Sequence, residues 1–308
     1  MSRKGKRRSR PVPDANVKQI AAELQKALGL EEKHSIDLQA LDGGAIAARE
    51  IAVRNLRFLK FYLGLPSEAF FTAVTLLDRF LSKMNVQEKY LSCVSISCLY
   101  ISCEIHKQPA DPNIFISVSQ TKCSINDMER MCDIIRKKLD IEPRAQPVTI
   151  YSYLNLFLRI FECAATKLNV KPLSSRMLQK KILSRRLEVV MINHVCASVR
   201  YPLIALALIQ YEIEQFLAAE VPSKSPYYSI EILRFLTVIV DLQSVCMVNA
   251  GELYTCYNNV KHVLKHYDDY KKSETKQKMR WQFSLSTLLG PRPLDSFSTN
   301  LSRISEVA

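Results

Sequence analysis

The chain has 308 residues, of which 48% are hydrophobic, so it can bury one large core or two ordinary ones. It contains only 7 glycines and no G-x-G-x-x-G or Walker-type run, which argues against nucleotide-dependent enzymes that use glycine-rich phosphate loops. No apolar run reaches the roughly 20 residues that a membrane helix needs. We therefore expect a soluble intracellular protein without a membrane partner.

The first ten residues carry six of the cations behind the net charge of +13 and no acid. Such a run is typical of a nuclear-import signal, and we predict residence in the nucleus and cytoplasm. A solvated tail or a loose nucleic-acid arm would have the same composition. The candidate import residues are Lys4, Lys6, Arg7 and Arg8.

Periodic apolar positions separated by short breaks predict an all-α chain. In the first half we expect five helices, the second starting after a cap at Ser67 and the fifth after Ser124. The third is rich in Ser and Cys, so neighbours can approach it closely and we place it at the centre of a bundle. The other three ranges are 45–63, 87–105 and 113–120.

The second of these helices contains Leu76-Leu77-Asp78-Arg79-Phe80-Leu81. Its apolar residues recur at helical spacing and form one buried face, on which Asp78 also lies. An unpaired buried carboxylate is costly, so the fold must bring Asp78 a cation or several hydrogen-bond donors. The opposite, solvent face is expected to hold Thr72, Thr75, Arg79, Ser82 and Lys83.

A second set of five helices is predicted after the prolines at 143 and 147. Its ranges are 149–167, 174–194, 201–219, 228–236 and 250–266. Two sets of similar size suggest a structural duplication, with one domain at 45–142 and another at 147–267. We expect a disordered basic tail at 1–20 and a polar, largely disordered tail at 270–308.

Nine cysteines are scattered along the chain rather than set at the spacing of metal ligands. Cys93, Cys98 and Cys103 share one predicted helix, but steps of five turn them about 140° apart. We read them as core-filling thiols. His262 and His266 stand four apart on a helix, a spacing that permits metal binding, but no acid or cysteine supports them. We predict no metal and no cofactor.

The segment from Ala73 to Ser82 is similar to the second helix of a cyclin box. The segment from Leu91 to Tyr100 resembles the third helix of the cyclin G and cyclin I branch, and Arg130-Met131 matches the fifth. With the layout of five plus five helices, the chain resembles the cyclin family from about residue 45 to 266. The resemblance implies two tandem five-helix cyclin boxes, and it implies that Arg49 is the partner of Asp78.

This resemblance also implies a regulatory protein without catalytic residues, which binds a cyclin-dependent serine/threonine kinase and positions its mobile helix. Family members anchor the kinase with a Lys near the end of the third helix and a Glu in the fifth. Here Glu104 and Cys132 occupy those positions, so the electrostatic anchor is altered. The candidates for the kinase interface are Glu104, Lys107, Met128, Cys132 and Ile135.

The family's docking groove for Arg-x-Leu peptides is altered as well. Ala48, Ala52 and Asn55 stand where the resemblance expects Met, Leu and Trp, which reduces the apolar area of the groove. The groove candidates are Arg49, Ile51, Ala52 and Asn55.

Two other functions stay open at this point. The cyclin G branch is associated with the B′ regulatory subunit of a serine/threonine phosphatase, so the chain could be a kinase-independent adaptor. The same double fold also serves transcription factors that bind nucleic acid. No basic stripe with interleaved aromatic residues is present to support that function. The one cluster of cations on a predicted helix reads as a solvated face and consists of Lys180, Lys181, Arg185 and Arg186.

Overall fold

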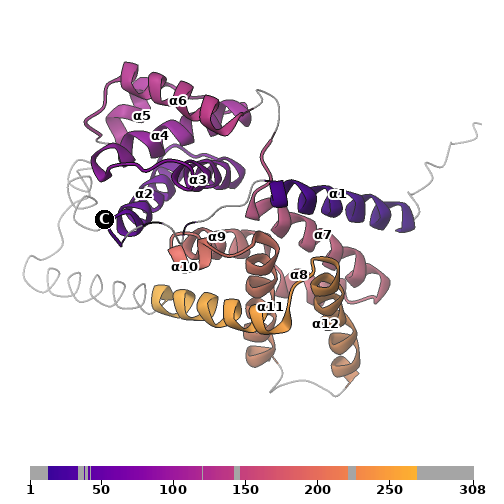
Figure 1. Ribbon diagram of the computed structural model, residues 1–308. Coiled ribbons are helices and arrows are strands. Elements are labelled where there is room, and N and C mark those ends of the chain that lie inside the picture. Colours follow the sequence, from indigo (N-terminus) through magenta and orange to yellow (C-terminus); the bar gives the residue numbers. More distant parts are fainter. Residues whose placement is uncertain are drawn as a thin grey trace, which may run out of the picture. The chain divides into compact units, whose positions relative to one another are not determined.

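The computed structural model describes most of the chain, and every regular element in the described residues is an α-helix (Figure 1). This confirms the predicted all-α fold class. The described ranges are 13–33, 38, 41, 43–119, 121–141, 146–220 and 227–268. The import candidates Lys4, Lys6, Arg7 and Arg8 and the tail at 270–308 lie outside them, so localisation stays a prediction.

By internal contacts the chain divides into one unit at 1–260 and a second at 261–308. The proposed boundaries at 45–142 and 147–267 stay a prediction.

The first half holds the expected five helices. They are α2 (Gly43–Tyr62), α3 (Ser67–Leu81), α4 (Glu88–Ile105), α5 (Pro112–Ser119) and α6 (Ile125–Leu139). Helix α4 contacts each of the other four, as its small residues predict. Its serines also bind neighbouring backbones, because Ser102 Oγ donates to Ala69 O at 2.6 Å and Ser97 Oγ donates to Met128 O at 3.2 Å.

Helix α3 lacks the solvent face that its sequence predicts. Thr72, Thr75 and Arg79 are buried, and Lys83, just after the helix, is the exposed residue of the expected polar set. The reason is tertiary, since α3 contacts α7 of the second half in addition to α2, α4 and α6. Thr75 finds its partner in the second half, where the hydroxyl of Tyr201 donates to Thr75 Oγ1 at 3.3 Å. Thr72 binds His106 and Arg79 donates to Leu139 O, both within the first half.

The second half contains α7 (Ile150–Lys167), α8 (Lys171–Met177), α9 (Lys180–Val190), α10 (His194–Ala197), α11 (Tyr201–Glu220) and α12 (Tyr227–Val245), followed by a helix at Ala250–Asp268. The single helix expected at 174–194 is divided, because the backbone leaves the helical region at Leu178 (φ −110°, ψ 67°). The β-branched run at 235–240 is helical and lies within α12.

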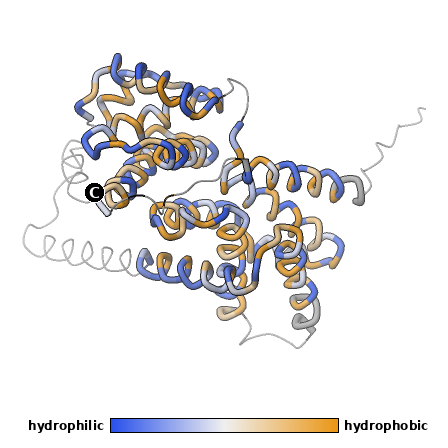
Figure 2. Tube along the Cα trace, viewed as in Figure 1, coloured by the Kyte–Doolittle hydropathy of each residue, from blue (hydrophilic) through white to orange (hydrophobic). Residues whose placement is uncertain are grey.

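Helix α11 forms much of the core of the second half, and Figure 2 shows it as largely hydrophobic. Its residues 201–209 are buried, and it contacts α7, α8, α9 and α12. Length and composition alone would let Tyr201–Ala219 cross a membrane, but 61% of that apolar window is buried within the protein. Its hydropathy therefore fits a helix enclosed by its neighbours.

Helix α1 (Pro13–Lys33) was not expected, and it begins inside the range predicted to be a disordered tail. A narrow apolar stripe of Ile20, Leu24 and Ala27 is buried, and α1 contacts α7. The sequence signal for this helix was the spacing of these three residues, four and then three apart, which is helical. Because few apolar residues make it, packing against α7 is needed to hold the helix.

Candidate partner-binding surfaces

The buried acid of α3 forms the expected ion pair with α2. Arg49 Nε donates to Asp78 Oδ1 at 2.8 Å and Arg49 Nη2 donates to Asp78 Oδ2 at 2.7 Å, with side chains 0% and 1% exposed. This bidentate geometry satisfies both carboxylate oxygens. The remaining donor, Arg49 Nη1, binds the carbonyl oxygens of Met191 at 2.9 Å and Ile192 at 2.8 Å. Arg49 therefore also joins the first half to the second.

The ends of α4 and α6 form an exposed charged surface. Glu104, in the last turn of α4, is 47% exposed and forms an ion pair with Arg136 of α6, which is 36% exposed. Arg136 Nη1 also lies 3.2 Å from Asp133 Oδ1. Lys107 follows α4 in a left-handed conformation (φ 53°) and is exposed. We call Glu104, Lys107, Asp133 and Arg136 the α4–α6 surface.

The other three interface candidates lie in the core, which corrects the expectation from the sequence. Met128, Cys132 and Ile135 are 0%, 2% and 0% exposed and belong to the buried stripe of α6. Cys132 Sγ donates to Ser97 O at 3.7 Å, and burial raises the pKa of this thiol to about 11, so it stays neutral. A Glu at position 132 would be buried here, whereas Arg136, one turn later, reaches the surface.

The groove candidates of α2 do not share one surface either. Arg49 and Ala52 are buried, whereas Ile51 and Asn55 are exposed. Further along the helix, Phe58, Phe61 and Tyr62 are 46%, 51% and 57% exposed. We call Ile51, Phe58, Phe61 and Tyr62 the α2 stripe.

The aromatic rings of the α2 stripe contact one another and nearby cations. The rings of Phe58 and Tyr62 stack with centroids 6.1 Å apart, and the Arg57 guanidinium lies 5.3 Å from the centroid of Phe61. Sequence reasoning missed this surface. The signal was the dense run Phe58-Leu59-Lys60-Phe61-Tyr62, which has more large apolar residues than one buried face holds.

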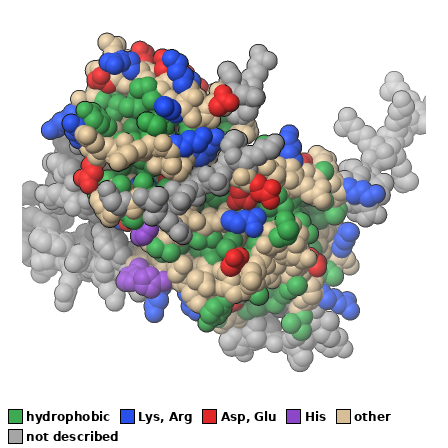
Figure 3. Space-filling view, in the orientation of Figure 1, with side chains coloured by type: hydrophobic (Ala, Val, Ile, Leu, Met, Phe, Trp, Pro, Cys, Tyr) green, Lys and Arg blue, Asp and Glu red, His purple; other side chains and the backbone are tan. Residues whose placement is uncertain are grey.

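Two of the four cations of the α9 cluster contact neighbouring side chains. The Lys180 ammonium lies 5.4 Å from the ring centroid of Tyr151, and Arg186 is ion-paired with Glu212. Lys180, Lys181 and Arg185 are all exposed. On the face shown in Figure 3, basic and acidic side chains are intermixed rather than gathered into one basic band.

The imidazoles of His262 and His266 have ring centroids 4.6 Å apart and both residues are exposed. Within the described part of the chain, no group of three or more His, Cys, Asp or Glu residues is arranged to hold a metal ion. Burial raises the pKa of Cys103 to about 12, which fits a core thiol.

Comparison with known proteins points to one family. The cyclin N-terminal domain matches residues 23–142, from within α1 to the end of the first helix set. Cyclin G of Drosophila melanogaster is 28% identical over 255 residues, which are 82% of this chain and 44% of that protein. Cyclin-G2 of Mus musculus is 31% identical over 175 residues, which are 56% of this chain and 48% of that protein. The chain thus matches less than half the length of these relatives.

A solved structure supports the same fold. A viral cyclin from herpesvirus saimiri aligns with a TM-score of 0.56 and 16% identity, covering 80% of this chain and 99% of that one. Its low identity limits this comparison to the fold. The matched domain, the relatives and the buried Arg49–Asp78 pair agree with one another. The chain therefore contains a cyclin N-terminal domain at residues 23–142 and is similar to the cyclin G proteins.

Proposed function

We propose that this chain is a cyclin G-like regulator of the cell cycle that acts through protein contacts, as a regulatory subunit of a cyclin-dependent serine/threonine kinase. The observation that supports this function is the exposed α4–α6 surface, which is built on an intact first helix set. Glu104 and Arg136 lie at its centre, at the ends of the two helices that carry the kinase in the family. The kinase supplies the catalytic groups, and this chain supplies the surface that positions them.

The polarity of the α4–α6 surface bears on which kinase it fits. The family pattern has a base on the third helix of the box and an acid on the fifth, whereas here the acid is on α4 and the base is on α6. Like charges placed against each other in an interface cost several kcal/mol. We therefore expect a kinase that presents a base to α4 and an acid to α6, the reverse of the usual partners.

Co-purification with a panel of cyclin-dependent kinases tests this function. Glu104→Lys and Arg136→Glu should each weaken capture of the preferred kinase, since each change leaves two like charges side by side. The double swap should shift preference toward kinases that bind cyclins of the usual polarity. Lys138→Glu is the matched control, because Lys138 is exposed about 200° around the same helix from Arg136. Capture of no kinase, or equal capture by all variants, would contradict the proposal.

The α2 stripe favours a second function, that of a kinase-independent adaptor. Exposed aromatic rings beside cations have the composition of protein-binding hot spots. A regulatory subunit of a serine/threonine phosphatase is the partner to test. Phe58→Ser with Tyr62→Ser should reduce its capture without changing capture of a kinase. Tyr254→Ser is the control, since Tyr254 is 69% exposed on another helix.

A further inference from the structure

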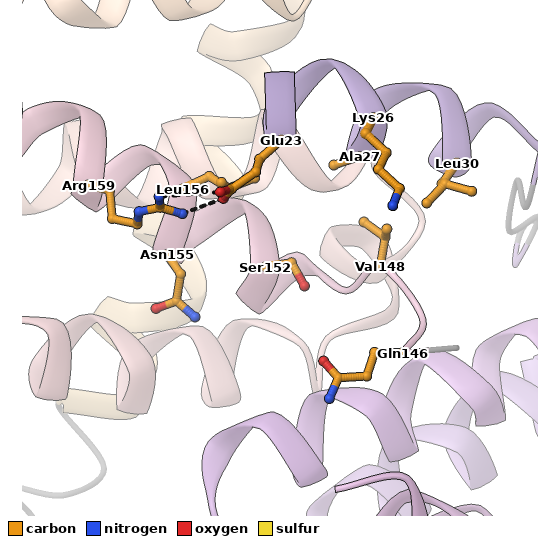
Figure 4. A pocket seen from close by; sticks show the side chains of 10 residues that line it. All are labelled: Glu23, Lys26, Ala27, Leu30, Gln146, Val148, Ser152, Asn155, Leu156 and Arg159. Carbon is orange, nitrogen blue, oxygen red and sulfur yellow. Dashed lines mark hydrogen bonds and ion pairs between the residues drawn. The ribbon is translucent and has the colours of Figure 1, made fainter. Parts of the chain in front are cut away.

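A cavity of about 370 Å³ opens between α1, the segment that precedes α7, and α7 itself (Figure 4). Its volume lies at the low end of the range for ligand sites, about 300–1,000 Å³. The cavity shares no residue with the α4–α6 surface or with the α2 stripe. The cavity is therefore separate from the two surfaces on which the proposed functions rest.

Helix α1 forms a fixed wall of this cavity. Ile20, Leu24 and Ala27 are buried and α1 contacts α7, so the middle of the helix is packed. Near its end, Glu31 Oε1 accepts from the backbone N–H of Tyr201 at 2.8 Å. With α1 held at both positions, the cavity exists before any ligand arrives.

Among its described lining residues, the cavity carries one positive charge without a counter-charge. The Glu23 carboxylate and the Arg159 guanidinium are ion-paired across one wall, and this contact lowers the pKa of Glu23. Because that pair is neutral as a whole, it leaves the charge of Lys26 unbalanced. Lys26 is exposed and has no acidic partner among the described residues. In Figure 4 its side chain extends from α1 in the direction of Val148.

Side-chain amides and apolar groups complete the lining. Gln146 is exposed at one edge, and Asn155 lies on α7. Asn155 Oδ1 is buried and is the side-chain oxygen that has no hydrogen-bond partner within the described part of the chain. A turn of this amide would present the oxygen to a ligand that donates an N–H group. Leu30, Val148 and Leu156 supply apolar surface between the polar groups.

We infer that this cavity binds an extended peptide segment of a partner protein in which an acidic side chain neighbours an aliphatic one. The carboxylate pairs with Lys26, the peptide backbone pairs with the amides of Gln146 and Asn155, and the aliphatic side chain covers Leu30 and Val148. A peptide supplies all three contacts, whereas a small free carboxylate supplies only the first. Charge complementarity and the unpaired amide oxygen together select this class of ligand.

Selection from a displayed library of random decapeptides on the full-length protein tests the inference. Enriched peptides should contain Asp or Glu beside Leu, Ile or Val. A fluorescein-labelled copy of the best peptide is then titrated with the protein and followed by fluorescence anisotropy. Lys26→Glu should weaken its binding by about tenfold or more, and Asn155→Leu should weaken it by a smaller factor.

A charge swap separates recognition from damage to the fold. A second peptide, with Lys in place of its acidic residue, should bind the Lys26→Glu protein better than it binds the wild type. Lys18→Glu is the matched control, because Lys18 is exposed on α1 and does not line the cavity. Enriched peptides without an acid, equal binding by the Lys26→Glu protein, or equal loss in the Lys18→Glu protein would each overturn the inference.

Discussion

At the scale of single residues, the Arg49–Asp78 pair shows how a charge is accommodated in a core. Desolvating two ions is costly, and the cost is offset only when geometry is good and every donor and acceptor is used. Here both carboxylate oxygens accept from Arg49, and the remaining guanidinium nitrogen donates to two backbone carbonyls. Neither partner can be removed without leaving an unpaired charge at a buried site.

We predict that Asp78→Ala lowers the free energy of unfolding by about 3–5 kcal/mol, because the buried Arg49 guanidinium loses its counter-charge. Urea unfolding followed by circular dichroism measures the loss. Asp133→Ala is the control, since Asp133 forms an ion pair with Arg136 while 69% exposed and should cost at most about 1 kcal/mol. Equal losses for the two variants would show that burial of the pair is not what matters.

At the scale of elements, several helices have polar side chains at their N-termini, among them α6 and α11. Helix α6 starts with a capping box, in which Asp127 N donates to Ser124 Oγ at 3.2 Å and Ser124 N donates to Asp127 Oδ2 at 3.0 Å. Glu31 of α1 binds the backbone at the start of α11 in a comparable way. Both contacts satisfy N–H groups that a helix leaves unpaired at its first turn.

Replacing Ser124 by Ala should lower the free energy of unfolding by about 1 kcal/mol, because an N–H of α6 loses its acceptor. Thermal unfolding monitored by circular dichroism detects the change. Ser117→Ala offers the comparison, since Ser117 is exposed within α5 and Ala favours a helix interior. A loss at position 117 as large as that at 124 would refute the capping argument.

Glu31 should make the docking of α1 dependent on pH. Burial raises its pKa above the ordinary value, while the Tyr201 N–H and Arg200 oppose that rise. A carboxyl group with a raised pKa favours the folded state below its ordinary pKa, and this contribution is lost as pH rises through the raised value. The stability of Glu31→Gln relative to wild type should therefore increase between about pH 4 and pH 7. Urea unfolding of both proteins at pH 4 and pH 7 measures this change. A difference in free energy of unfolding that is the same at the two pH values would contradict the prediction.

At the scale of the whole molecule, buried polar contacts join the two helix sets of the first unit. Glu188 of α9 is 0% exposed and binds Lys60 of α2, while Arg57 Nε lies 3.4 Å from its other oxygen. Ser67 donates to the same carboxylate at 3.4 Å. Arg49 also binds the carbonyls of Met191 and Ile192, and Glu50 accepts from His194 N, so α2 is joined to the second half at several points.

We expect Glu188→Ala to lower the free energy of unfolding by about 3–5 kcal/mol, since it leaves the buried Lys60 ammonium without its acid. Replacing both partners, as Lys60→Leu with Glu188→Leu, should recover much of that loss because no unpaired charge remains at the site. Equilibrium unfolding in urea compares these variants with the wild type and with the single variants Lys60→Leu and Glu188→Leu. If the double Leu variant loses as much stability as the two single Leu variants lose together, Lys60 and Glu188 do not act as a pair.

Most helices of this protein follow from local information. Apolar spacing and the serine that caps α6 predict the first helix set to within a few residues, because these signals act within one or two turns. The same spacing places Asp78 on a buried face and so requires a partner. The identity of that partner, Arg49, came from the family resemblance.

The sequence by itself thus determined the all-α fold, the five helices of the first set and the need for a polar or charged partner for the buried Asp78. Only the tertiary structure decided that α3 is enclosed on all sides, that Cys132 is internal and that Arg136 faces Glu104. The physical reason is the same in each case. Periodicity says which side of a helix is apolar, whereas exposure depends on which other helices, distant in sequence, lie against it.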